Sequence, residues 1–103
     1  MRKRETRNYD KDPIRTYQAM RQAVIKSDLI LVHSDKETGV VDAKSKSSFV
    51  FFGGDAFKLN ILKIDEHNTQ VVVSVDKQVN GTKLTAVANE IFDIMDSELP
   101  IGE

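Results

Sequence analysis

The sequence predicts an α+β domain in which two helices pack on one face of a four-stranded antiparallel sheet. Two observations lead to this prediction. Apolar residues recur at helical spacing near each end of the chain, and between those segments they alternate with polar residues in four short runs. The predicted order is therefore α-β-β-β-β-α, and a chain of 103 residues has room for one such core.

The two helices are predicted from capping signals and apolar stripes. The first is expected to begin at Pro13, because Asp12 can cap the free amides and proline at the first helical position loses no hydrogen bond. Its stripe ends before Ser27 and contains Ile14, Tyr17, Met20, Ala23 and Val24. The last helix is expected after Asn80-Gly81, with Thr82 as its cap. Its stripe ends before Pro100 and contains Leu84, Val87, Ala88, Ile91, Ile94 and Met95.

The first predicted hairpin joins residues 28–34 (DLILVHS) to residues 40–45 (VVDAKS) through turn-forming residues. Opposing Leu31 to Val41 keeps apolar residues on one face and leaves 35–37 as a three-residue loop. The alternation places Leu29, Leu31 and His33 on one face of this strand.

The second predicted hairpin joins residues 56–64 (AFKLNILKI) to residues 69–76 (TQVVVSVD) through a turn at 66–68. Opposing Ile61 to Val73 puts the apolar alternation of both strands on the same face. The same register places Lys58 opposite Asp76 on the solvent side, a favourable cross-strand pair.

Residues 1–11 are predicted to form a flexible basic tail, and residues 12–99 a single domain. The chain contains no cysteine, which excludes disulfides, thiolate zinc sites and a catalytic cysteine. A net charge of −1 argues against specific nucleic-acid binding. No apolar run follows the basic residues or is long enough to span a membrane, so a cytoplasmic location is expected for the chain as given.

Asp35 and residues 39–43 form a D-x-x-x-G-[IV]-[IV]-x-A pattern. Together with the order of a helix, a strand, a Ser-rich link, a valine-rich strand and a closing amphipathic helix, this pattern resembles the mature domains of small bacterial envelope lipoproteins of unknown function. The likeness covers about residues 7–99 and implies a binding or structural module without catalytic residues. The chain lacks that family's signal peptide and lipidated cysteine, so a cell-envelope location is expected only if a signal peptide was removed.

The sequence predicts no metal, no cofactor and no enzymatic activity. Residues 33–37 and 65–67 bring two histidines and several carboxylates to the hairpin tips, but without a closely spaced histidine pair, and acidic turns commonly cap their own backbone. Ser47 and Ser48 lack a nucleophile-elbow pattern, and Asp55 has no second polar group tied to it by the sequence.

Residues 47–57 (SSFVFFGGDAF) contain the first candidate binding site. One interpretation is that Phe49 and Phe51 extend a strand into the core and the glycines form a bend. The other is an apolar loop that docks a protein partner or makes peripheral contact with a membrane. The residues of this loop are Phe49, Val50, Phe51, Phe52, Gly53 and Gly54.

The second candidate is the sheet face turned away from the helices, which favours a homodimer. Its apolar residues are Ile30, Val32, Val40, Leu62 and Val72. The function that follows is a non-enzymatic interaction or structural module, and the resemblance above implies an association with the cell envelope. The alternative is a small-ligand or lipid-binding carrier, which needs a cavity on the order of a few hundred Å³.

Overall fold

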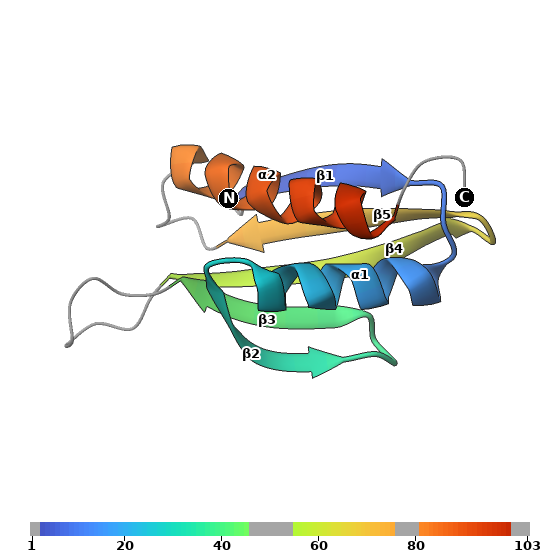
Figure 1. Cartoon of the computed structure of the whole chain (residues 1–103), viewed down its shortest axis with the longest axis horizontal. Coiled ribbons are helices and arrows are strands. Elements are labelled where there is room, and N and C mark those ends of the chain that lie inside the picture. Colours follow the sequence, from blue (N-terminus) through green and yellow to red (C-terminus); the bar gives the residue numbers. More distant parts are fainter. Residues whose placement is uncertain (1–2, 46–54, 76–80, 100–103) are drawn as a thin grey trace.

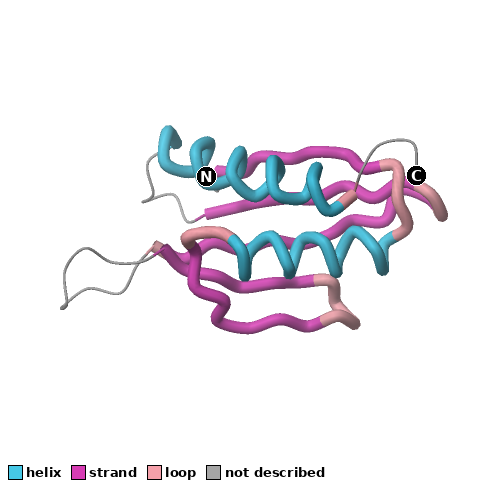
Figure 2. The backbone as a smooth tube through the Cα atoms, viewed as in Figure 1, coloured by secondary structure: helices cyan, strands magenta, loops and turns pink. Residues whose placement is uncertain are grey.

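The computed structural model describes residues 3–45, 55–75 and 81–99 of the chain. These residues form one five-stranded antiparallel sheet with two helices side by side on one face (Figure 1). Figure 2 shows the same two layers, and the described residues place no helix on the other face of the sheet. In chain order the elements are β1 (Lys3–Tyr9), α1 (Pro13–Lys26), β2 (Leu29–Asp35), β3 (Val40–Ser45), β4 (Ala56–Asp65), β5 (Asn68–Val75) and α2 (Gly81–Glu98).

The predicted α+β class with two helices and an antiparallel sheet is confirmed, but the predicted strand number and element order are wrong. The added strand is β1, which lies within the segment expected to be a flexible tail. It pairs with β5, so the strand order is β1-β5-β4-β3-β2 and both terminal positions of the sheet are open edges. The sequence of β1, KRETRNY, has no apolar alternation, and its role as a strand depends on partners far away in the sequence.

Helix α1 begins where the sequence predicts. The Asp12 carboxylate accepts a hydrogen bond from the Arg15 amide (3.3 Å), and the helix starts at Pro13. Ile14 departs from the predicted stripe, because its side chain is exposed to solvent. Helix α2 begins at Gly81, one residue before the predicted cap Thr82.

The core lies between the sheet and the two helices. Met20 and Val24 of α1, Ile91 of α2, and Leu59 and Val73 of the sheet are completely buried. Leu31, Ile61, Val87 and Ile94 pack against this core while partly exposed. Among the described residues, the hollows lie at the surface between the elements.

Both predicted hairpin registers are shifted by two residues. Leu31 pairs with Ala43 rather than Val41, and Ile61 pairs with Val71 rather than Val73. A shift of two residues keeps the side chains of these paired segments on their faces, so the predicted burial of Leu29, Val41 and Ala43 survives although the partners change. In the first hairpin the loop is 36–39, where Gly39 has φ of +72° and its amide donates to the Asp35 carbonyl (2.9 Å).

A β-bulge in β2 changes the face of the residues that follow it. The register slips between Leu31 and His33, so His33 pairs with Asp42 and Ser34 pairs with Val41. His33 therefore shares the outer face with Asp42, which corrects the prediction that it lies with Leu31. Ser34 turns to the helix side instead, where its hydroxyl accepts a hydrogen bond from Arg21 Nε (3.2 Å).

Lys58 pairs with Ser74 in the observed register, and Asp76, its predicted partner, lies outside the described residues. Neither helix that the structure describes has the length and apolar character needed to cross a membrane.

Candidate ligand-binding groove

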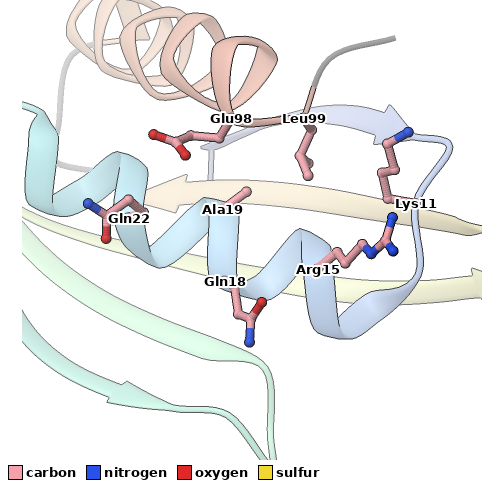
Figure 3. A pocket seen from close by; sticks show the side chains of 7 residues that line it. All are labelled: Lys11, Arg15, Gln18, Ala19, Gln22, Glu98 and Leu99. Carbon is pink, nitrogen blue, oxygen red and sulfur yellow. The ribbon is translucent and has the colours of Figure 1, made fainter. Parts of the chain in front are cut away.

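A groove of ≈ 470 Å³ lies between the first half of α1 and the end of α2 (Figure 3). We call it the α1–α2 groove. Its lining residues are Lys11, Arg15, Gln18, Ala19, Gln22, Glu98 and Leu99.

The groove exists because the end of α2 is not level with the start of α1. They run in opposite directions, and α2 ends before it reaches the start of α1, so no helix of the described residues lies next to the first turn of α1 (Figure 1). The last turn of α2 is closed by a hydrogen bond from the Leu99 amide to the Met95 carbonyl (2.8 Å). An ion pair between Lys26 and Glu98 ties this end of α2 to the last residue of α1.

Lys11 enters the groove from the short link between β1 and α1. Its backbone carbonyl accepts a hydrogen bond from the hydroxyl of Thr69 (2.9 Å), a completely buried residue of β5. Lys11 itself is only 7% exposed although it carries an ammonium group. The sheet therefore fixes the backbone of Lys11, a cationic residue, at one end of the groove.

The groove has a charged end, an apolar middle and a polar end. Figure 3 shows Lys11 and Arg15 at one end, Ala19 and Leu99 between the ends, and Gln22 and Glu98 at the other. Glu98 is paired with Lys26, so the polar end carries little net charge. An elongated molecule with one charged group fits this order of side chains.

Two aspartates approach the cations from outside the groove. Asp10 Oδ1 lies 4.0 Å from Lys11 Nζ, and Asp12 Oδ1 lies 3.6 Å from Arg15 Nε. Neither aspartate lines the groove, whereas both cations do. The contact with Asp12 involves Nε of Arg15, and the guanidinium carries four further N–H donors on its two terminal nitrogens.

A second hollow of ≈ 730 Å³ lies beside the first turns of α2 and next to β1. Its lining residues are Arg4, Glu5, Gly81, Thr82, Leu84, Thr85, Ala86 and Asn89. Only Leu84 among them is buried, whereas the α1–α2 groove includes two buried side chains, Lys11 from the β1–α1 link and Ala19 from α1. The second hollow is therefore the less enclosed of the two.

The predicted apolar loop, Phe49 to Gly54, lies outside the described residues. Residues 46–54 are not described, but Ser45 and Asp55, which border them, are. The Ser45 amide donates to the Asp55 carbonyl (2.9 Å), and the Asp55 amide donates to Ser45 Oγ (2.9 Å). Lys83 of α2 forms an ion pair with the Asp55 carboxylate. Asp55 thus has a charged partner that the sequence alone did not indicate.

The predicted outer-face residues differ in their exposure. Ile30, Val32 and Leu62 are 40%, 59% and 50% exposed, and Val40 is half-buried. Val72 is only 6% exposed, although the prediction placed it on the open face. It sits on β5 between Thr6 of β1 and Asn60 of β4, and neighbours on both sides shield a residue of an inner strand.

The hairpin turns use their acidic residues to hold their own backbone. Asp35 Oδ1 accepts from the Glu37 amide (2.9 Å), and Asp65 Oδ1 accepts from the His67 amide (2.8 Å). The hydrogen bonds from His67 and Asn68 hold the pKa of Asp65 below its usual value. Within residues 3–45, 55–75 and 81–99, no group of three or more metal-binding side chains comes together.

The residues that line the α1–α2 groove were not identified from the sequence. Arg15, Gln18, Ala19 and Gln22 do follow one another at helical spacing, which is a signal for a shared helix face. Whether that face lines a groove depends on where α2 ends, and the spacing of residues within α1 carries no information on the end of α2.

The fold resembles solved structures of low sequence identity. The solution structure of the Aha1 dimer from Colwellia psychrerythraea matches with a TM-score of 0.66 and 11% identity, covering 100% of this chain and 98% of that chain. The crystal structure of Ara h 8.0201 matches at 0.58 and 11%, covering 96% and 97%. The di-domain ARO/CYC BexL from the BE-7585A biosynthetic pathway matches at 0.57 and 8%, covering 96% of this chain and 44% of that chain.

No family model matches the sequence, and no curated protein shows a significant sequence match. What these comparisons establish is a fold shared with the three structures.

Proposed function

We propose that this protein is a small-ligand-binding domain and that the α1–α2 groove holds the ligand. The groove is the observation that carries the proposal. Its volume of ≈ 470 Å³ lies within the range of about 300 to 1,000 Å³ typical of ligand pockets. Its lining combines apolar side chains with a few polar and charged groups, the composition that lets a pocket bind a ligand and orient it.

The shared fold supports this function over that of a purely structural module. One of the similar structures, BexL, is named as an ARO/CYC protein of a biosynthetic pathway. A small molecule is the class of partner proposed here. The proposed role is binding without chemical conversion, because Glu98 lies at the opposite end of the groove from Lys11 and Arg15 and forms no acid–base pair with either of them.

The test uses the fluorescent probe 1-anilinonaphthalene-8-sulfonate and amide chemical shifts of the isotope-labelled protein. We expect the probe to shift the amides of residues 11–22 and of the last turn of α2. Gln22→Trp places an indole ring in the groove and should weaken probe binding at least about fivefold, the equivalent of about 1 kcal/mol.

Asn89→Trp is the matched control, because it places the same ring in the second hollow. It should leave probe binding within about twofold of the wild type. If the shifts cluster instead around the first turns of α2, and Asn89→Trp abolishes them while Gln22→Trp does not, the α1–α2 groove is not the binding site.

The second candidate function is self-association through the outer sheet face. The exposed side chains of Ile30, Val32 and Leu62 favour it, because this face carries no helix in the described part of the chain. The first of the similar structures is itself a dimer. Two copies could bind ligand independently in this arrangement, since the α1–α2 groove lies on the helical side of the molecule.

A further inference from the structure

The two ends of the α1–α2 groove differ in charge, and this difference narrows the class of ligand. Lys11 and Arg15 line one end, while the aspartates that approach them, Asp10 and Asp12, do not line the groove. At the other end, the charge of Glu98 is balanced by Lys26. A ligand in the groove therefore meets two cationic side chains at one end and one carboxylate, which is paired with Lys26, at the other.

The cationic end suits a carboxylate or a similar flat anion. A guanidinium presents parallel N–H donors that match the two oxygens of a carboxylate, and such bidentate contacts are among the stronger hydrogen bonds in proteins. Lys11 adds a second charge from a position only 7% exposed, where water screens its field less than on the open surface. The Arg15 side chain is 66% exposed, so Lys11 supplies the less screened of the two charges.

The middle of the groove limits the shape of the ligand. Ala19 is buried, and its short side chain leaves space above it in the groove. Leu99 borders the groove from the end of α2 (Figure 3). Arg15 and Gln22 are seven positions apart on α1. At a rise of about 1.5 Å per residue, the distance along the helix is about 10 Å. A bicyclic aromatic body or a chain of comparable length fits between them.

We infer that the ligand is an amphipathic monoanion of this size, with its anionic group at Lys11 and Arg15 and its apolar body over Ala19 and Leu99. This inference rests on the proposed function, because it specifies the ligand of the same groove. It goes further, because it requires the groove to bind a negatively charged ligand more tightly than the neutral counterpart of that ligand.

The experiment compares 2-naphthoate with 2-naphthamide, which have the same ring system and differ in charge. Amide chemical shifts of the labelled protein are followed at pH 7 and constant ionic strength. We expect 2-naphthoate to shift the amides of residues 11–22 and 95–99, and 2-naphthamide to bind there at least about tenfold more weakly.

Arg15→Gln removes the guanidinium and keeps a polar side chain of similar reach. It should weaken 2-naphthoate binding about tenfold and change 2-naphthamide binding less than about twofold. Arg21→Gln is the matched control, because it makes the same charge change on the same helix at a side chain that contacts Ser34 and does not line the groove. It should leave the binding of both compounds unchanged, and the amide spectrum of each variant verifies its fold.

The outcomes separate this inference from the function it depends on. If both compounds bind in the groove with equal affinity, or Arg15→Gln has no more effect than Arg21→Gln, the anionic specificity is wrong and the groove remains a binding site. If neither compound shifts the groove amides at millimolar concentration, both the inference and the proposed function are overturned.

Discussion

At the scale of single residues, Tyr9 stands out because its polar group is buried without a hydrogen bond. The residue is 7% exposed, and its hydroxyl has no partner of acceptable geometry among the described residues. Arg7 and Asp96 lie close by and form an ion pair (2.6 Å), with the Arg7 guanidinium 4.9 Å from the centre of the Phe92 ring. Burial and the charge of Asp96 raise the pKa of Tyr9 above its usual value, against the opposing effect of Arg7.

Tyr9→Phe should therefore keep the free energy of unfolding at pH 7 or increase it by up to about 1 kcal/mol, because a buried hydroxyl without a partner is removed. In the wild type, the raised pKa means that stability is complete below the usual tyrosine pKa of about 10 and decreases as the pH rises beyond it. Tyr9→Phe should lack this part of the decrease. Urea unfolding of both proteins between about pH 7 and 11 measures the difference, and a large loss at pH 7 would show that the hydroxyl is well satisfied.

At Gly39 the backbone adopts a conformation that favours glycine over other residues. Its φ of +72° lies in the left-handed region, and an added Cβ would lie 2.6 Å from Ile61 Cγ1. Gly39→Ala should lower the free energy of unfolding by about 1 to 3 kcal/mol. Gly81→Ala is the control, because a Cβ there has no neighbour within 4 Å. If urea denaturation finds the two substitutions equally tolerated, the turn geometry is not as described.

At the scale of elements, the edge strand β1 is held by α2 as well as by β5. The Arg7–Asp96 ion pair and a hydrogen bond from the Thr85 hydroxyl to the Glu5 carboxylate (3.0 Å) both link the strand to the helix. Each contact stabilises the fold only modestly, since an exposed pair contributes about 0 to 1 kcal/mol to the free energy of unfolding. The pairing with β5 and the cover it gives to Val71 and Val73 account for the larger part of the strand's contribution.

Deletion of residues 1–8 tests whether this segment is part of the fold. Removing β1 exposes the edge of β5 and one side of α2, so we expect a loss of several kcal/mol out of the about 5 to 15 kcal/mol that stabilise a typical domain. Circular dichroism during thermal unfolding measures the effect. The control, Arg4→Thr with Asn8→Thr, changes two exposed residues of the same strand and should stay within about 0.5 kcal/mol of the wild type. If the truncated protein is as stable as the wild type, the prediction of a flexible tail at residues 1–11 is correct after all.

At the scale of the whole molecule, the two sheet faces differ in cover. The helices bury one face, and the other leaves Ile30, Val32 and Leu62 exposed on β2 and β4. Charged residues such as Lys44 and Lys58 lie among them on the same face. The apolar residues are thus dispersed over two strands, which favours a weak dimer over a permanent one.

We expect the average mass in sedimentation equilibrium to rise with protein concentration, with a dissociation constant on the order of tens of micromolar. Ile30→Lys and Leu62→Lys should each keep the protein monomeric without unfolding it, because both side chains are exposed. Ile25→Lys, at an exposed position of α1, is the control and should self-associate like the wild type. A wild-type protein that is monomeric at about 1 mM would exclude this interface.

Local patterns were sufficient to predict most of the elements. The cap at Asp12 and Pro13 marked the start of α1, and alternation in residues 56–64 and 69–76 marked β4 and β5. These signals work because a capping hydrogen bond and side-chain alternation involve neighbours in the sequence. Register was less accurate, since a shift of two residues leaves every apolar side chain on the same face.

The sequence by itself therefore determined two amphipathic helices, two hairpins and the faces they bury. Only the tertiary structure made a strand of Lys3–Tyr9, because its backbone pairs with β5 and its Arg7 forms an ion pair with Asp96 of α2, and these partners lie at least 60 positions away in the chain. Only the tertiary structure created the α1–α2 groove, because a groove depends on where α2 stops relative to α1. Both features depend on the distance between elements, and no local pattern of residues encodes that distance.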